Sequence, residues 1–221
     1  MKKTAIILGA TGLTGNLLLQ QLLKDERYGQ IILFSRKSSD TKDPKIKEYL
    51  IDLFELYRYE QEFKADEVFC CIGTTKAKTP DKQTYKAIDY GIPVSAARLC
   101  KINNIPTFIV VSALGAKKKS TFFYNRIKGL MEKDVLKYDI KNTYILQPSL
   151  IEGQRREKRT GEWFFKQLAS AMPFLKVGPL KKYQPVPASK IAKAMIHLAN
   201  SNSQEVRIKN PKIHEIADAN D

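Results

Sequence analysis

The chain has 221 residues, of which 43% are hydrophobic and 28% charged, and its formal net charge is +15 at pH 7. This composition is typical of a folded soluble protein of one domain, and no apolar run reaches the ~20 residues of a membrane span. The three cysteines and two histidines show no metal-ligand spacing, which argues against a disulfide framework and a zinc site. Because the first residues do not resemble a signal peptide, we expect a cytosolic location.

The positive charge is spread over several clusters. The main ones are Lys117–Lys119, Arg155–Arg159 and Lys181–Lys182, and no aromatic residues interleave them. Such a field attracts anions of any kind. Because the alternating aromatic and basic residues of a stacking groove are missing, we favour a solvated basic surface over dedicated nucleic-acid binding.

The first predicted strand, Ala5–Leu8, runs into a glycine turn and then a helix whose leucines recur at helical offsets over Asn16–Leu23. This order is the context of a dinucleotide-binding fingerprint, because glycine lets the backbone approach a pyrophosphate and the helix N-terminus offers free N–H groups. The pattern is GxxGxxG, and a plain glycine turn is the alternative. The predicted cofactor contacts here are Gly9, Thr11, Gly12, Leu13, Thr14 and Gly15.

The second predicted strand, Ile31–Phe34, is followed by Ser35, Arg36 and Lys37. In a dinucleotide-binding unit, an acid about 20 residues past the glycines binds the ribose 2′-hydroxyl of NAD, whereas an arginine suits the 2′-phosphate of NADP. Ser35 stands 20 residues after Gly15, with no acid beside it. The sequence therefore favours NADP(H) over NAD(H), with a solvated basic turn as the alternative.

The third predicted strand, Glu48–Ile51, leads to Asp52 and Leu53. We expect these two residues near the adenine, where the Asp52 carboxylate would meet the amino group. The same carboxylate could equally cap the short helix predicted over Phe54–Phe63.

The fourth predicted strand, Glu67–Ile72, ends in the small residues Gly73, Thr74 and Thr75. A loop at the carboxyl end of a strand lies where α/β sheets bind ligands. We therefore expect this loop to contact the ribose or the pyrophosphate.

The next part of the chain continues the alternation of helix and strand. The predicted elements are a helix over Asp81–Asn103, a strand over Ile105–Val111, a helix over Phe122–Tyr138 and a strand over Thr143–Leu146. This alternation predicts an α/β protein with a Rossmann-like, doubly wound parallel sheet.

Beyond residue 149 the regular alternation of predicted helices and strands stops. We expect helices over Glu162–Ala171 and over Ser189–Asn200, with Ser189 as the N-cap, a proline-containing loop over Lys176–Pro187 and a short strand over Glu205–Ile208. A segment of about 70 residues without regular alternation would make a thin core alone. We therefore interpret residues 150–221 as a substrate-side cover within a single domain of residues 1–221, whose Rossmann core is residues 1–149.

Three polar residues are predicted to meet at the carboxyl edge of the sheet. Ser112 ends the fifth strand, and Tyr124 and Lys128 share one helix face because they are four residues apart. A nearby ammonium would lower the tyrosine pKa from about 10, and the serine would orient a carbonyl oxygen. This set is suited to general acid–base catalysis beside a hydride-donating cofactor, although Ser112 could simply cap a turn and a Tyr–Lys pair also arises by chance.

The glycine turn, Ser112 and the Tyr124–Lys128 pair resemble those of the short-chain dehydrogenase/reductase superfamily, atypical branch. The chain is most similar to the Tat-interacting protein family of NADPH-binding proteins. The further residues that carry this resemblance are Cys70–Thr75, Asp89–Tyr90, Val111–Ala116, Tyr124–Glu132, Thr160–Trp163 and Val186–Pro187.

The resemblance implies a Rossmann-like fold, NADPH at Gly9–Gly15 and Ser35–Lys37, and a triad of Ser112, Tyr124 and Lys128. It also implies Pro148 near the nicotinamide, and a protein partner, since members of that family are described chiefly as redox-linked regulators. Asp89 lies near the place of an asparagine in ordinary short-chain enzymes. Trp163 and its neighbours would line a substrate pocket or pack in the cover.

Two functions follow as hypotheses. The first is an NADPH-dependent reductase of a small carbonyl-type substrate, and the second is an NADPH-sensing regulator without useful chemistry. A nucleotide-sugar epimerase or reductase is disfavoured, because the segment after the sixth strand is short for such a site.

Overall fold

The computed structural model describes residues 1–153 and 182–219. Within them, seven parallel strands form one sheet in the order β3-β2-β1-β4-β5-β6-β9. The strands are β1 Lys3–Leu8, β2 Tyr28–Ser35, β3 Ile46–Leu50, β4 Glu67–Cys70, β5 Thr107–Val111, β6 Asn142–Gln147 and β9 Arg207–Lys209. This sheet confirms the predicted Rossmann-like α/β fold.

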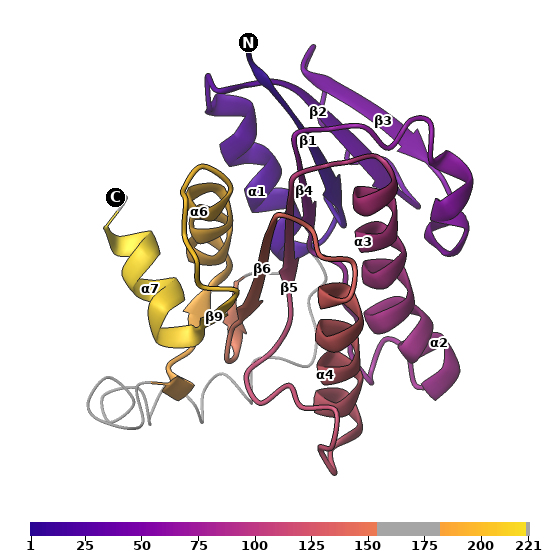
Figure 1. Cartoon of the computed structure of the whole chain (residues 1–221), viewed down its shortest axis with the longest axis vertical. Helices are drawn as coiled ribbons and strands as arrows, with labels where there is room; N and C mark the ends of the chain where they lie inside the picture. Colours follow the sequence, from indigo (N-terminus) through magenta and orange to yellow (C-terminus); the bar gives the residue numbers. More distant parts are fainter. Residues whose placement is uncertain (154–181, 220–221) are drawn as a thin grey trace.

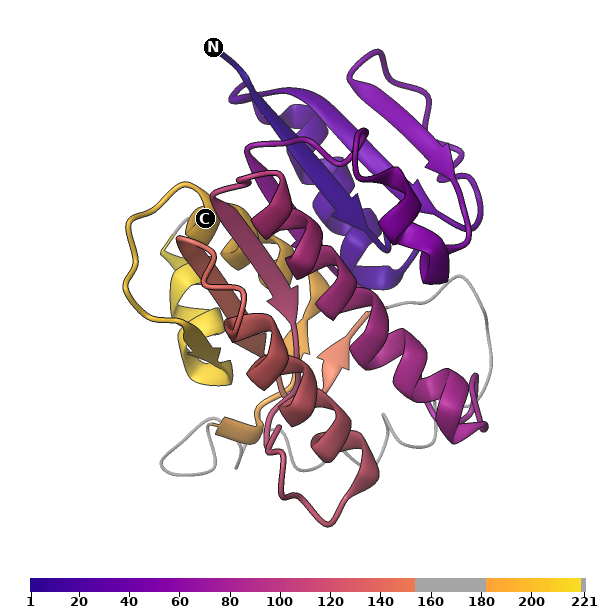
Figure 2. The same cartoon turned by 45° about the vertical axis from the view of Figure 1, so that its right-hand side comes forward.

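Helices cover both faces of the sheet (Figure 1), and Figure 2 brings α3 and α4 in front of it. One face carries α1 Leu13–Lys24, α6 Ala188–Ala199 and α7 Asn210–Asp218, and the other carries α3 Ile92–Ile102 and α4 Phe123–Leu136. The remaining helical segments are α2 Lys82–Lys86, the 3₁₀ segment η1 Leu53–Tyr59 and the π-helical turn η2 Ala87–Gly91.

The strand sequences explain this layering, because successive side chains of a strand point to opposite faces. In β1, Ala5 and Ile7 belong to the hydrophobic cluster under α1 and α6, whereas Ile6 and Leu8 belong to the cluster under α3. A strand that buries both faces must be apolar at nearly every position, which is the composition of a central parallel strand.

The C-terminal part of the chain enters the layered core. β9 pairs with β6 at the edge of the sheet, and α6 packs beside α1. A two-stranded parallel sheet, β7 Ile151–Glu152 with β8 Val186–Pro187, brackets residues 154–181. The remainder of the expected cover, including Trp163 and the helix expected over Glu162–Ala171, lies outside the described residues.

Two local predictions need correction. Ser189 is inside α6, whose N-cap is Pro187, so it does not cap the helix. The segment predicted as one helix over residues 81–103 consists of α2, η2 and α3 in succession, and the π-helical turn η2 was not predicted.

The strand order places the ligand-binding edge. Starting from β1, the strands β2 and β3 follow toward one edge of the sheet, whereas β4, β5 and β6 follow toward the other edge. The strand order therefore reverses between β1 and β4. In open α/β sheets, ligands bind beyond the carboxyl ends of the strands at this switch point.

Candidate functional site

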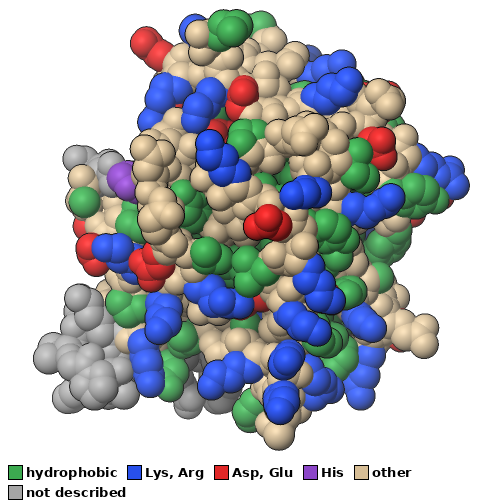
Figure 3. All heavy atoms as spheres, in the orientation of Figure 1, with side chains coloured by type: hydrophobic (Ala, Val, Ile, Leu, Met, Phe, Trp, Pro, Cys, Tyr) green, Lys and Arg blue, Asp and Glu red, His purple; other side chains and the backbone are tan. Residues whose placement is uncertain are grey.

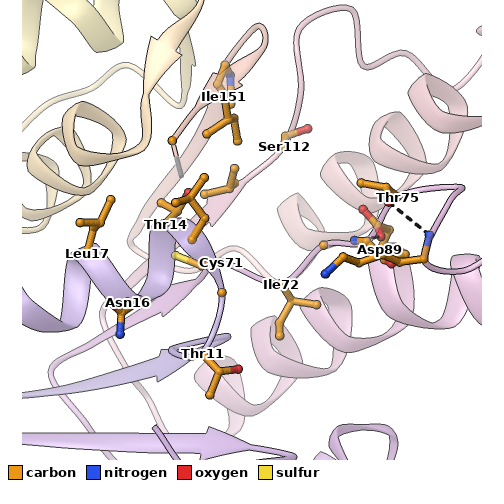
Figure 4. A pocket seen from close by; sticks show the side chains of 18 of the residues that line it. Thr11, Thr14, Asn16, Leu17, Cys71, Ile72, Thr75, Asp89, Ser112 and Ile151 are labelled. Atoms are coloured by element: carbon orange, nitrogen blue, oxygen red, sulfur yellow. Dashed lines mark hydrogen bonds between the residues drawn. The ribbon is translucent and has the colours of Figure 1, made fainter. Parts of the chain in front are cut away.

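A cavity of about 930 Å³ lies at the switch point. Its walls come from the glycine turn, the loop after β4, the end of β5, the start of α4 and the loop after β6. Figure 4 shows Thr11 and Thr14 on one side of it, Thr75 and Asp89 on another, and Ser112 from a third element. The predicted site residues that line it are Thr11, Gly12, Leu13, Thr14, Gly73, Thr74, Thr75, Ser112, Tyr124, Lys128 and Pro148.

The glycine turn needs its glycines for close packing. Gly9 has a φ of +88°, which disfavours other residues, and a Cβ there would lie 3.0 Å from the carbonyl oxygen of Cys71. A Cβ on Gly15 would overlap the carbonyl oxygen of Gly9. These two glycines therefore let α1 begin directly against the turn, while Gly12 lines the cavity.

The N-terminus of α1 is open toward the cavity. Its N-cap is Gly12, which makes no side-chain capping bond, and the first turn holds no acidic residue. Leu13 and Thr14 of this turn line the cavity. Uncapped N–H groups and the positive end of the helix dipole make this end suitable for an anion.

Only some of the residues predicted to bind the adenosine end of the cofactor line a common cavity. Arg36 and Asp52 line a second cavity of about 390 Å³, whereas the side chain of Leu53 packs in the hydrophobic core. Ser35 is buried and Lys37 is exposed. The Asp52 carboxylate accepts a hydrogen bond of 2.9 Å from the backbone N–H of Phe54, which is the capping alternative.

An acidic residue near Ser35 was not predicted from the sequence. Glu48 lies on the adjacent strand β3, and its Oε1 is 3.4 Å from Ser35 Oγ. Its carboxylate also accepts hydrogen bonds from Ser38 Oγ at 2.8 Å and from the backbone N–H of Ser39 at 2.9 Å. Ser38 and Ser39 line the main cavity, so Glu48 fixes the loop that forms this wall.

Lys128 is buried at the cavity and paired with a carboxylate. Its Nζ lies 2.9 Å from Asp89 Oδ1 and donates to the carbonyl oxygen of Val111 at 3.3 Å. Burial lowers the pKa of Lys128, but the Asp89 carboxylate and the nearby Tyr124 more than offset this, so its pKa is raised. Lys128 therefore remains an ammonium at neutral pH.

Ser112 is also engaged by a buried carboxylate. Its Oγ donates to Glu132 Oε1 at 2.6 Å, and the same oxygen accepts from Gln147 Nε2 at 2.9 Å. Arg207 donates from Nε to Glu132 Oε2 at 3.0 Å. Because a hydroxyl has one hydrogen, Ser112 presents only its oxygen lone pairs to the cavity.

Tyr124 lies at the cavity wall and is 41% exposed. Loss of water contact raises the pKa of its phenol and Asp89 adds to the increase, whereas Lys128 lowers it. The net pKa lies above the ordinary value, so the expectation of a lowered tyrosine pKa was wrong. The main reason is the loss of water contact around the phenol, which outweighs the effect of the Lys128 ammonium, and the Asp89 carboxylate adds to the increase.

Further residues of the cavity wall were not predicted. All but Ile151, which lies in the short strand β7, fall on loops after strands or on the first turns of α1, where spacing gives little signal. They include Asn16, Leu17, Asp40, Cys71, Ile72, Ser149, Leu150, Ile151 and Gly153. Asp89 did have a signal, because it stands near the place where the resembling enzymes carry an asparagine.

Residues 1–153 and 182–219 contain no group of three or more His, Cys, Asp and Glu side chains arranged to hold a metal ion. No helix in this part of the chain combines the length and the apolar character required to cross a membrane.

Comparison with known proteins identifies the family. A family model described as NAD(P)H-binding matches residues 9–160. The chain belongs to this family. FMP52 of Debaryomyces hansenii is 30% identical over 204 residues, which cover 89% of this chain and 88% of that protein. HTATIP2 of Rattus norvegicus is 28% identical over 175 residues, covering 77% and 72%, which confirms the expected resemblance to the Tat-interacting protein family.

Solved structures show the same fold. UDP-N-acetylglucosamine 4-epimerase from Methanobrevibacter ruminantium has a TM-score of 0.71 at 17% identity, covering 95% of this chain and 77% of the epimerase. WbmG from Bordetella bronchiseptica, solved in complex with NAD, has a TM-score of 0.69 at 13% identity, covering 99% and 77%. At such identities the likeness concerns the fold alone.

The comparisons overturn the expectation of a cytosolic location. The relatives from Debaryomyces hansenii, Candida albicans, Scheffersomyces stipitis and Candida glabrata are all named as mitochondrial proteins. The lack of resemblance to a secretory signal peptide was a poor guide, because other compartments are reached through other targeting signals that their own receptors recognise.

Proposed function

We propose that this protein is an NADP(H)-dependent oxidoreductase that reduces a small carbonyl-type substrate. The observation that carries the proposal is that Tyr124, Lys128 and Ser112 line the same cavity as the glycine turn. Membership of an NAD(P)H-binding family supports it. The volume of about 930 Å³ lies within the range of small-molecule and cofactor sites.

The cavity walls fit an extended dinucleotide. The uncapped start of α1 would bind the pyrophosphate, and the Lys128 ammonium would donate to hydroxyls of the nicotinamide ribose. Arg36 at the second cavity would pair with a 2′-phosphate, with Lys37 adding charge. The Glu48 carboxylate already accepts from Ser38 and Ser39, so it is engaged by the protein itself.

The side chains then divide the chemistry between them. When bound, NADPH supplies the hydride. Tyr124, protonated at neutral pH, donates a proton to the substrate oxygen as general acid. Lys128 orients the ribose, and Ser112, whose hydrogen is directed to Glu132, offers an acceptor to a neighbouring donor such as the phenol or a substrate hydroxyl.

The second candidate is a dinucleotide-sensing regulator that binds NADPH and changes its affinity for a protein partner. The raised pKa of Tyr124 favours it in one respect, because the phenol is not activated as a base in the free protein. A partner whose binding shifts with NADPH, together with no oxidation of the cofactor across a broad carbonyl panel, would support this candidate over the reductase.

The experiment is the Tyr124→Phe variant, assayed for carbonyl-dependent oxidation of NADPH. Loss of the proton donor should lower turnover by about 10²–10⁴-fold while NADPH affinity changes little. Tyr57→Phe is the matched control, because Tyr57 is similarly exposed but lies outside the cavity wall. Equal turnover of Tyr124→Phe and the native protein would refute the assignment of Tyr124.

A further inference from the structure

Asp89 is a charged residue buried where the fold departs from a regular helix. It lies in the π-helical turn η2, between α2 and α3, and is buried. Such turns are rare and occur frequently at functional sites, because the extra residue redirects a side chain. Here the side chain reaches the wall of the main cavity (Figure 4).

Both carboxylate oxygens of Asp89 are used, each by a different element. Oδ1 lies 2.9 Å from Nζ of Lys128 on α4, and Oδ2 accepts a hydrogen bond of 2.8 Å from the backbone N–H of Thr74 in the loop after β4. Gly73 passes close by: a Cβ there would lie 3.5 Å from Asp89 Oδ1 and 3.8 Å from Lys128 Nζ. One side chain therefore joins a helix, a second helix and a cavity loop.

Stability alone is a poor explanation for this arrangement. The side chains of Lys128 and Asp89 are 4% and 1% exposed, so both charges have lost their water. The cost of that desolvation commonly equals or exceeds the attraction between the charges. Apolar residues of similar size in place of a buried ion pair often give a protein of equal stability. What the pair does provide is a fixed place for one ammonium beside the loop.

We propose that Asp89 is a positioning residue for the nicotinamide half of the cofactor: it holds Lys128 and the Gly73–Thr75 loop as one unit, so that both meet the nicotinamide ribose together. This inference rests on the proposed function, since it takes the cavity to bind NADPH. It predicts that Asp89 affects the half of the cofactor beyond the pyrophosphate and not the adenosine half.

The test compares two ligands by titration calorimetry. In the proposed binding mode NADPH would span the whole cleft, whereas adenosine 2′,5′-bisphosphate contains only the adenosine end and would not reach Lys128. Asp89→Asn retains an oxygen that can accept from Thr74 but removes the charge that holds Lys128, and Asp89→Ala removes both. We expect NADPH affinity to fall about tenfold in Asp89→Asn and further in Asp89→Ala, with the affinity for the fragment unchanged.

Glu67→Gln is the matched control. Glu67 is a buried carboxylate that pairs with Lys3 at 2.9 Å, but it lies at the start of β4, the opposite edge of the sheet. The same chemical change there should alter neither affinity. Equal losses for NADPH and the fragment in the Asp89 variants, or no loss for either, would overturn the inference and leave the proposed function standing. Failure of the native protein to bind either ligand would overturn both.

Discussion

Two buried carboxylates determine what the polar residues of the cleft can do. Asp89 pairs with Lys128, and Glu132 accepts the hydroxyl hydrogen of Ser112. The lysine is therefore a fixed ammonium whose charge is largely matched, and the serine is an acceptor toward the cavity. Spacing alone predicts the three polar side chains but not these partners, which decide the direction of each hydrogen bond.

The raised pKa of Tyr124 gives a prediction for the pH dependence of reduction. A general acid works while it is protonated, so its contribution is complete below its pKa and is lost as pH rises through it. Because partial burial and Asp89 raise this pKa, opposed by Lys128, the alkaline limb of the rate profile should lie above the ordinary tyrosine value of about 10. A limb that lies well below that value and vanishes in Tyr124→Phe would contradict this prediction.

Cofactor preference is predicted to depend on Arg36. Arg36→Ala should weaken NADPH binding about tenfold and leave NADH binding nearly unchanged, because in the proposed binding mode the guanidinium would meet only the 2′-phosphate. Arg58→Ala, which removes another exposed arginine, is the control. Native protein that binds the two cofactors with equal affinity in titration calorimetry would show that the preference for NADPH is wrong.

At the scale of elements, the contact between α1 and the glycine turn is the tightest part of the site. Gly15→Ala should destabilise the protein by about 1–3 kcal/mol, since its Cβ would overlap the Gly9 carbonyl oxygen and displace the helix. It should also weaken NADPH binding. Urea denaturation and calorimetry measure the two effects.

Gly91→Ala is the matched control for that substitution. A Cβ on Gly91 meets nothing within 4 Å, and its φ of −62° is helical. Alanine there should therefore be neutral or stabilise by about 0.5–1 kcal/mol. Equal stability losses in the two variants would indicate a general intolerance of substitution instead of the steric contact at Gly15.

The sequence predicts helices and strands better than it predicts the direction and partners of individual side chains. Apolar runs such as Ala5–Leu8 identify central strands, because a strand buried on both faces must be apolar throughout. The π-helical turn that directs Asp89 into the cavity has no comparable signal, since α2, η2 and α3 share one helical pattern. Glu48 was missed for another reason: strand pairing, and not sequence distance, brings it to Ser35.

At the scale of the molecule, the chain carries a large positive charge. Lysine and arginine side chains are scattered over the face in Figure 3, and they are densest in its lower half, where α2 and α4 lie in the same view. A net charge of +15 raises the local concentration of anions. A cofactor with several phosphate charges would be attracted to the protein before it reaches the cleft.

The amino edge of the sheet carries a separate buried network. Glu67 accepts hydrogen bonds from Tyr28 and Lys3, and Lys3 also donates to Asn200 at the end of α6. This network joins β1, β2 and β4 to the C-terminal part of the chain. Burial raises the pKa of Glu67, although the hydrogen bonds from Tyr28 and Lys3 oppose the increase.

This raised pKa gives a prediction for stability. A carboxyl group with a folded-state pKa above 4.5 stabilises most at low pH, and the contribution is lost as pH rises through the folded value. The stability of the native protein relative to Glu67→Gln should therefore fall as pH increases from 4.5, as measured by urea denaturation. A difference that grows with pH over this range would contradict the direction assigned to Glu67.

The most direct measurement for the whole account is a crystal structure of the protein with NADPH. We predict density for the pyrophosphate at the start of α1, the 2′-phosphate at Arg36 and the nicotinamide ring beside Tyr124. Cofactor density elsewhere on the molecule, or an empty cleft at saturating NADPH, would contradict the central claim.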